Sequence, residues 1–147
     1  VTVLQDSSST LANLSNANLT NGGSKDSTNK VQVSAANKTN AHTVVSSNNV
    51  AASLGASIGV AVEVVNLEAQ SSASVSNADV GTANNGFAAL NVTANNELTS
   101  SFQNVTDAAS TLVGIGVGVG VLNVNGITTA SVDNARAYAD NIQVNAA

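Results

Sequence analysis

The chain contains two related stretches, IGVAVEVVNLEAQSSASVSNA (Ile58–Ala78) and IGVGVGVLNVNGITTASVDNA (Ile115–Ala135), and their relationship decides the fold. They belong to longer segments, Ala51–Ala78 and Ala108–Ala135, which align without a gap after a shift of 57 residues and are identical at 14 of 28 positions. Biased composition alone would give about 3 matches. The two segments are therefore copies of one internal repeat.

A third copy lies at the start of the chain. After a shift of 61 residues, VTVLQ (Val1–Gln5) aligns with VEVVN, and ANLSNA (Ala12–Ala17) aligns with ASVSNA of the middle copy. A strand-like block follows each copy, at 14, 12 and 7 residues past its last Ala: Val31–Asn37, Leu90–Asn96 and Ile142–Ala147. Because length changes are tolerated where the backbone is solvated, the segment of variable length is predicted to be a surface loop.

The composition predicts strands. Val, Ile and Thr account for 39 of the 147 residues, whereas Glu, Lys, Arg, Met and Gln account for only 12. β-Branched side chains fit a pleated sheet better than a helix. With three or four strand-like blocks in each repeat of about 57–60 residues, the chain is predicted to be all-β, a β-solenoid or β-helix of tandem repeats. A β-sandwich is the alternative.

The repeats predict a single β-repeat domain over residues 1–147, divided into a partial repeat (1–46), a repeat (47–104) and a second partial repeat (105–147). The first copy lacks its opening strand, and the third lacks everything after its last strand. We therefore expect either a fragment of a tandem array or a protomer that neighbouring copies complete. With one Tyr and two Phe, the core is expected to consist of Val, Ala, Leu and Ile.

Apolar residues alternate with glycine from Val113 to Val121, which predicts a strand with one aliphatic face. The other face has no side chains, so a second backbone layer is expected to approach it closely. Asn125-Gly126 predicts either a hairpin turn or, because the middle copy has Glu68-Ala69 there, a bend between strands of one coil.

Asn recurs at matched turn positions, Asn16, Asn77 and Asn134. Stacked Asn side chains can hydrogen-bond along a ladder of parallel strands. Asn is also a good turn former in its own right, and both interpretations stay open.

The charge balance argues against nucleic acid as a partner. The chain has four Lys and Arg residues against nine carboxylates, so it lacks the basic patch that neutralises phosphates. Its longest apolar run, Leu112–Leu122, is too short for a helix that crosses about 30 Å of hydrocarbon, so no membrane span is expected. Without Cys there is neither a disulfide nor thiolate chemistry.

No residue is assigned a catalytic, cofactor-binding or metal-binding role, and the chain is predicted not to be an enzyme. The single imidazole, His42, has no nucleophile motif with it and is interpreted as a structural, solvent-facing residue. No cofactor is predicted. Calcium held by turn oxygens near Asp79, Asp133 and Asp140 is the one alternative, although no calcium-loop motif is present.

Two further features concern the surface. Glu63 lies in the middle of a strand where the next copy has Gly120, and it is expected to face water or to oppose edge-to-edge association. The chain also contains five N-x-S/T sequons, which matter only in a host that glycosylates secreted proteins: Asn13, Asn18, Asn37, Asn91 and Asn104.

The motif of Ile115–Ala135, the related motif of Ile58–Ala78 and the following NIQVNAA or ALNVTANN resemble the repeats of large bacterial filamentous surface adhesins, of the haemagglutinin and leukotoxin-like autotransporter kind. The likeness covers nearly the whole chain. It implies a secreted β-helical shaft at the cell surface, with adhesion to host or bacterial surfaces often located elsewhere in the protein. The repeat motif carries no catalytic or binding residue.

Two functions follow as hypotheses. The first is a structural, non-catalytic repeat module of an extracellular adhesin or fibre, in which strands stack and Val and Leu fill the interior. The second is a self-assembling extracellular filament subunit, in which identical subunits or neighbouring repeats complete the half-repeats at the termini by strand addition.

Overall fold

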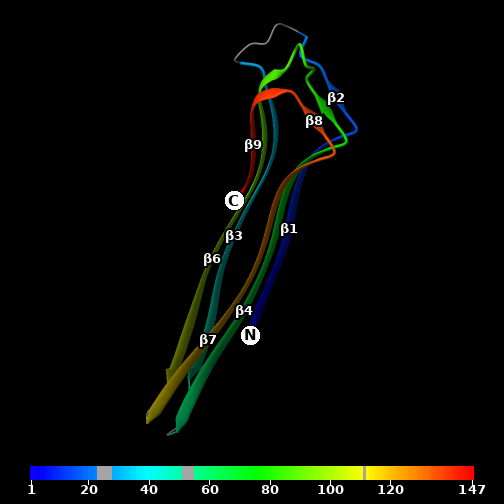
Figure 1. Ribbon diagram of the computed structural model, residues 1–147. Coiled ribbons are helices and arrows are strands. Elements are labelled where there is room, and N and C mark those ends of the chain that lie inside the picture. The colour runs from blue at the N-terminus through cyan, green and yellow to red at the C-terminus, as the bar shows by residue number, and fades with distance from the viewer. Residues whose placement is uncertain (23–27, 51–54, 111) are drawn as a thin grey trace. The chain divides into compact units, whose positions relative to one another are not determined.

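The computed structural model describes residues 1–22, 28–50, 55–110 and 112–147. These residues form strands, turns and bends without a helix. The strands are β1 (Thr2–Ser15), β2 (Asn18–Leu19), β3 (Lys30–Val50), β4 (Ala56–Ser76), β5 (Asp79–Val80), β6 (Phe87–Ala109), β7 (Val113–Asp133), β8 (Arg136–Ala137) and β9 (Ala139–Ala146) (Figure 1).

Three parallel sheets organise these strands, in the orders β1-β4-β7, β2-β5-β8 and β3-β6-β9. Each sheet takes one strand from every repeat, so each repeat forms one coil that stacks on the next (Figure 1). Parallel pairing between strands three apart in the chain is the pattern of a β-solenoid, whereas β-sandwiches are built from antiparallel neighbours. The solenoid prediction is confirmed.

The register of the sheets reproduces the sequence repeat. Asn18 pairs with Asp79 at an offset of 61, and Asp79 pairs with Arg136 at an offset of 57. In the third sheet Leu90 pairs with Ile142, the first residues of the two aligned strand-like blocks. The offset between the second and third coils is therefore 57 in the second sheet and 52 in the third, and this difference of five residues lies in the connections from β5 to β6 (residues 81–86) and from β8 to β9 (residue 138), where a loop of variable length was predicted.

The chain forms two compact units, each assembled from three separate segments. Unit 1 comprises Val1–Ser7, Thr39–Glu68 and Leu98–Asn125, and unit 2 comprises Ser8–Lys38, Ala69–Glu97 and Gly126–Ala147. Since the long strands contribute to both units, the unit boundaries cut across the sequence repeats.

Unit 2 has a core of small aliphatic side chains, as the composition predicts. Its buried members are Val33, Ala35, Ala73, Val75, Ala78, Val80, Leu90, Val92 and Ala94. Partly buried residues from the outer coils, among them Leu14 and Ala130, pack against this cluster. Each inward position is therefore covered by its equivalents in the coils on either side.

Unit 1 has a smaller apolar core. Ala41, Val65 and Leu67 are buried together, with Leu4 and Leu98 packed against them. The expected interior of Val and Leu is wrong for the first half of β7, because its Val and Ile side chains from Val113 to Val121 are exposed. The glycines of this strand face inward in their place.

The predicted close approach at these glycines is confirmed. A Cβ atom added at Gly114 would overlap the backbone carbonyl of Ala108. Further along the strand the nearest atoms belong to side chains: an added Cβ would lie 2.7 Å from Thr106 Oγ1 at Gly116 and 3.1 Å from Asn104 Cβ at Gly118. All three contacts are with β6, so the glycine face of β7 lies directly against that strand. A side chain on this face would separate the two strands.

Neither turn predicted at Asn125-Gly126 is present. The pair lies inside β7, which is continuous from Val113 to Asp133, and Gly126 does not adopt a positive φ. On either side of the pair β7 keeps its bonds to β4, from Asn123 Nδ2 to Asn66 Oδ1 and from Asn77 N–H to the Asp133 carbonyl. Pairing with a neighbouring strand outweighs the local preference of Asn-Gly for a turn.

Candidate functional site

The most regular polar feature is a corner in unit 2 where β1, β4 and β7 end. Asn16, Asn77 and Asn134 occupy this corner with positive φ values of 52°, 49° and 46°. They are the three matched Asn residues of the repeat. Asn tolerates the left-handed conformation better than other residues with a Cβ, so the turn interpretation is correct.

The ladder interpretation is confirmed for one of its two steps, from the third coil to the second. Asn134 Nδ2 donates a hydrogen bond of 2.6 Å to Asn77 Oδ1, from one coil to the one before it. A similar bond of 2.7 Å joins Asn123 Nδ2 to Asn66 Oδ1 in unit 1. Each Asn pair thus links equivalent positions of successive repeats.

The backbone repeats the same bonds from coil to coil at the corner. Asn16 N–H donates to the Ser76 carbonyl, and Asn77 N–H donates to the Asp133 carbonyl, both at 3.1 Å. In the reverse direction, Asp79 N–H donates to Ala17 and Arg136 N–H to Ala78, both at 2.9 Å. The corner therefore presents the same donors and acceptors to the coil on either side.

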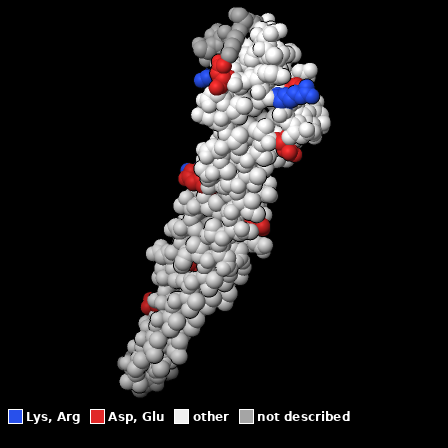
Figure 2. All heavy atoms as spheres, in the orientation of Figure 1, with Lys and Arg blue, Asp and Glu red and all other residues white. Residues whose placement is uncertain are grey.

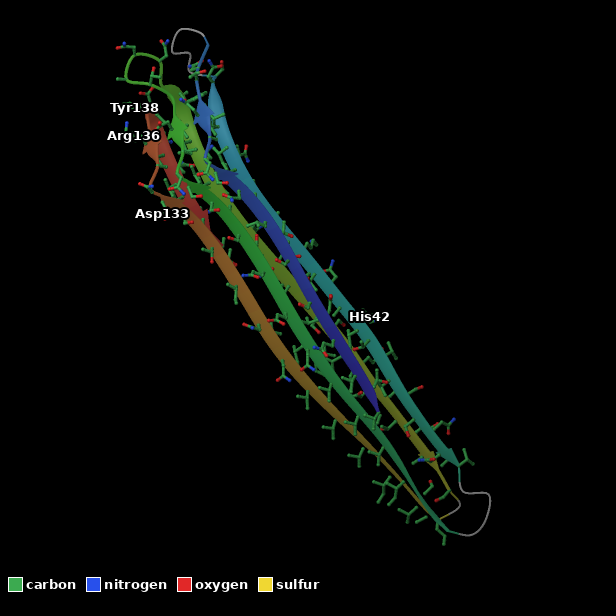
Figure 3. The ribbon with its side chains drawn as sticks, turned by 90° about the vertical axis from the view of Figure 1, so that its right-hand side faces the viewer. His42, Asp133, Arg136 and Tyr138 are labelled. Atoms are coloured by element: carbon green, nitrogen blue, oxygen red, sulfur yellow. The ribbon has the colours of Figure 1, made fainter. Side chains whose placement is uncertain are left out.

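An open groove of about 490 Å³ follows the corner. It is lined by three residues from each coil: Asn16, Ala17, Asn18, Asn77, Ala78, Asp79, Asn134, Ala135 and Arg136. Arg136 Nε lies 4.0 Å from Asp79 Oδ1, and both side chains are largely exposed, so this ion pair contributes little. Figure 3 shows Asp133, Arg136 and Tyr138 near one another at this end of unit 2.

The candidate chemical residues do not form a reactive centre. His42 is exposed on β3, as predicted, next to the buried Ala41 (Figure 3). In the part of the chain that the structure describes, no group of three or more His, Asp or Glu residues lies close enough to hold a metal ion. Charged side chains are few and scattered on the face shown in Figure 2.

The five sequons differ in accessibility. Asn13 and Asn18 are exposed, whereas Asn37 is 8% exposed and its Nδ2 donates to Ser8 Oγ at 2.9 Å. Asn91 and Asn104 are partly buried, and their Oδ1 atoms lie buried without a partner. A glycan on Asn37 would require the loss of the bond to Ser8 and the opening of β3.

The expectation for Glu63 is wrong. Its side chain is 0% exposed, and neither carboxylate oxygen has a hydrogen-bond partner. β4 faces β3 across the interior: Val65 packs with Ala41, and Gly59 lies near Ser47. Glu63 lies between Val65 and Gly59 on β4, so it faces the interior opposite Thr43, which lies between Ala41 and Ser47 on β3. Glu63 lies on the same side of β4 as the buried Ala61, Val65 and Leu67, a choice of face that the sequence does not reveal because the other side is equally apolar.

The sheet edges are the remaining candidate surface. β1, β2 and β3 form the edges on one side, and β7, β8 and β9 form those on the other. The middle strand β4 buries every second residue, β6 and the edge strand β3 bury fewer, and the edge strands β7 and β9 have no fully buried position. Open edges present backbone N–H and C=O groups that another strand can pair with.

Comparison with protein-family models, with curated proteins and with solved structures finds no match for this chain. Among the described residues there is also no helix long and apolar enough to cross a membrane. The functional argument therefore rests on the stacked coils, their open edges and the exposed faces.

Proposed function

We propose that this chain is a structural, non-catalytic repeat module of a secreted bacterial surface adhesin or extracellular fibre. The observation that carries the proposal is the repeated register, in which Asn18, Asp79 and Arg136 occupy equivalent positions of three stacked coils. A coil that presents the same bonds on both sides can be repeated without new contacts, which is how solenoid proteins gain length. The resemblance of the repeats to filamentous adhesins supports the extracellular assignment.

The role of such a module is mechanical. Each added coil lengthens the stack by one strand spacing, about 4.8 Å, and places another layer of hydrogen bonds and aliphatic side chains on the last. The small side chains of the core, such as Ala73 and Val75, suit this role because they stack in layers without requiring individually shaped neighbours.

One coil can be added to test this role. A second copy of residues 48–104 is inserted directly after Asn104. This adds one repeat of 57 residues and keeps the following residues in the same register. We expect a folded protein with a higher urea midpoint, and a maximum dimension along the stack that is about 4.8 Å greater by small-angle X-ray scattering. An aggregated or partly unfolded product would contradict the repeat-module proposal.

The cellular location has its own test. Antibodies raised against the purified chain are expected to label intact cells of the source organism without permeabilisation. Labelling that requires permeabilisation would refute the surface assignment while leaving the repeat-module role standing.

A second candidate function is a self-assembling filament subunit that polymerises by strand addition. The observation that favours it is the match between the two edges: the free edge of β7 is equivalent to the edge of β4 that pairs with β7, and the free edge of β1 is equivalent to the edge of β4 that pairs with β1. Such a head-to-tail contact does not close and therefore builds fibres. Negative-stain electron microscopy of the chain should show regular fibres, and deletion of Val1–Gln5 should abolish them. Unchanged fibres after this deletion would exclude strand addition through β1.

A further inference from the structure

Unit 1 carries an exposed aliphatic surface on the outer side of the sheet β1-β4-β7. It consists of every second residue from Val113 to Val121 on β7, every second residue from Ile58 to Val64 on β4, and Val3 on β1. We call these ten residues the valine face. Val60 is 52% exposed on the middle strand, and Val119 is 44% exposed on β7.

The valine face points outward because the opposite side of the same strands is committed to the interior. Gly116 and Gly118 lie against β6, and on β4 the neighbouring Ala61 and Glu63 are buried. Since side chains alternate across a strand, the aliphatic residues between these positions must lie on the other side. The exposure of these residues therefore follows from which side of each strand faces the interior. It does not depend on the rotamers of individual side chains.

The valine face is uncharged and ends at a polar row. Gln5, Asn66 and Asn123 lie next to it, joined in part by the bond from Asn123 Nδ2 to Asn66 Oδ1. The exposed Glu68 follows on β4 two residues beyond Asn66. An apolar centre with a polar border is the usual arrangement of a protein–protein contact surface.

The area of the valine face suits a dimer. At roughly 30 Å² of accessible surface for each methyl or methylene group, eight side chains that are about half exposed, with the partly buried Val62 and Val64, present about 500 Å² per copy. Two such faces would bury about 1,000 Å², the least that a specific interface is expected to bury. An apolar patch of several hundred Å² with a polar rim is often a functional contact surface.

We infer that the valine face is the contact surface for a second copy of this chain, packed sheet against sheet. Two uncharged faces with Val and Ile at alternate positions of neighbouring strands can interdigitate in the manner of stacked sheets about 10 Å apart. A lipid surface fits less well, because the net charge of −5 opposes anionic headgroups and the valine face contains neither a cation nor an aromatic residue.

This contact differs from strand addition. Two valine faces form a self-complementary, two-fold contact that closes at two copies, whereas strand addition at the sheet edges is head-to-tail and open. The inference therefore holds or fails independently of the filament proposal. If both contacts operate, strand addition builds a fibre and the valine faces join two fibres side by side.

The test compares two double variants by sedimentation velocity between about 1 and 500 µM. Val60→Thr with Val119→Thr alters the valine face, and Val44→Thr with Val105→Thr makes the same chemical change at exposed valines of β3 and β6 in the same unit. Thr keeps the shape and strand preference of Val, so circular dichroism and the urea midpoint should stay unchanged in both.

We expect wild type and the Val44/Val105 variant to dimerise equally, and the Val60/Val119 variant to dimerise about 100-fold more weakly, because four hydroxyl groups enter the contact of two copies. If fibres form, the Val60/Val119 variant should give single fibres where wild type gives paired ones.

Equal self-association of the three proteins would overturn the inference, and so would a monomeric wild type. Binding of a monomeric wild type to phosphatidylcholine vesicles, lost in the Val60/Val119 variant, would assign the face to lipid and also overturn it.

Discussion

Asn134 donates its Nδ2 hydrogen to Asn77 Oδ1 at 2.6 Å, and both residues hold the left-handed backbone conformation at the same corner of successive coils. One residue type thus meets two demands at one position. The turn requires a residue that tolerates a positive φ, and the contact between the second and third coils requires a donor at position 134 and an acceptor at position 77. Asp at position 134 could not donate this bond, and Gly at either position would satisfy only the backbone.

Replacing Asn77 should separate these two contributions. Asn77→Ala loses the side-chain bond from Asn134 and strains the left-handed backbone, so we expect the free energy of unfolding to fall by about 1–3 kcal/mol. Asn77→Gly keeps the conformation accessible and should cost about 1 kcal/mol less than the Ala variant. Urea denaturation of the three proteins measures both differences. An Ala variant as stable as the Gly variant would show that the positive φ contributes nothing.

The glycines of β7 should differ in their tolerance of a methyl group. At Gly114 a Cβ would overlap the carbonyl of Ala108, which is backbone and cannot move without breaking the strand, so Gly114→Ala should lower stability by at least about 2 kcal/mol. Gly118→Ala meets only Asn104 Cβ at 3.1 Å and should cost less. Gly22→Ala is the control, because nothing lies within 4 Å of its added Cβ. Thermal denaturation should rank the variants in this order, and equal midpoints would contradict the close approach of β7 to β6.

Glu63 should reduce stability in its ionised form. Burying a carboxylate without a hydrogen-bond partner is costly, and an amide of the same shape is cheaper to bury. We therefore expect Glu63→Gln to raise the free energy of unfolding at pH 7 by about 1–3 kcal/mol. The exposed Glu68 supplies the matched control, since Glu68→Gln should change stability by less than about 0.5 kcal/mol. A destabilised Glu63→Gln variant would mean that the carboxylate has a stabilising partner in solution.

Leu90 should be the most sensitive apolar position of unit 2. It is completely buried in the middle coil, and Leu90→Ala would leave a cavity in a core that has few large side chains, at a cost of about 2–5 kcal/mol. Leu11→Ala removes the same atoms from a side chain that is 69% exposed and should be nearly neutral. Urea denaturation of the two variants tests this contrast. Similar losses in both would show that the core of unit 2 is not where the packing energy lies.

The stacking of coils was predictable because it depends on a repeat that the sequence displays directly. Once Asp79 is aligned with Asn18 and Arg136, equivalent residues of parallel coils must be neighbours, and the pairing confirms it. The left-handed corner was predictable for the same reason, since Asn recurs there in all three copies.

Other features depend on which side of a strand faces the interior, and hydrophobicity alone is misleading there. The alternation of Val and Gly from Val113 to Val121 suggests that Val is inside, yet the close contact of β7 with β6 places glycine inside. The same phase buries Glu63. The turn predicted at Asn125-Gly126 is absent because continuous pairing along β7 outweighs the local turn preference of these two residues.

The connection after β5 and its equivalent after β8 differ in length, from residues 81–86 to residue 138 alone, while the corner before them is the same in every coil. A gene that encodes such coils can change in two ways without losing the fold: recombination between copies can add or remove a whole coil, and small insertions or deletions can accumulate at the connections between strands. A one-residue deletion inside β4 or β6 would instead turn every following side chain of that strand to the opposite face. Descendants of one ancestral coil should therefore vary in number and at these connections more than inside the strands.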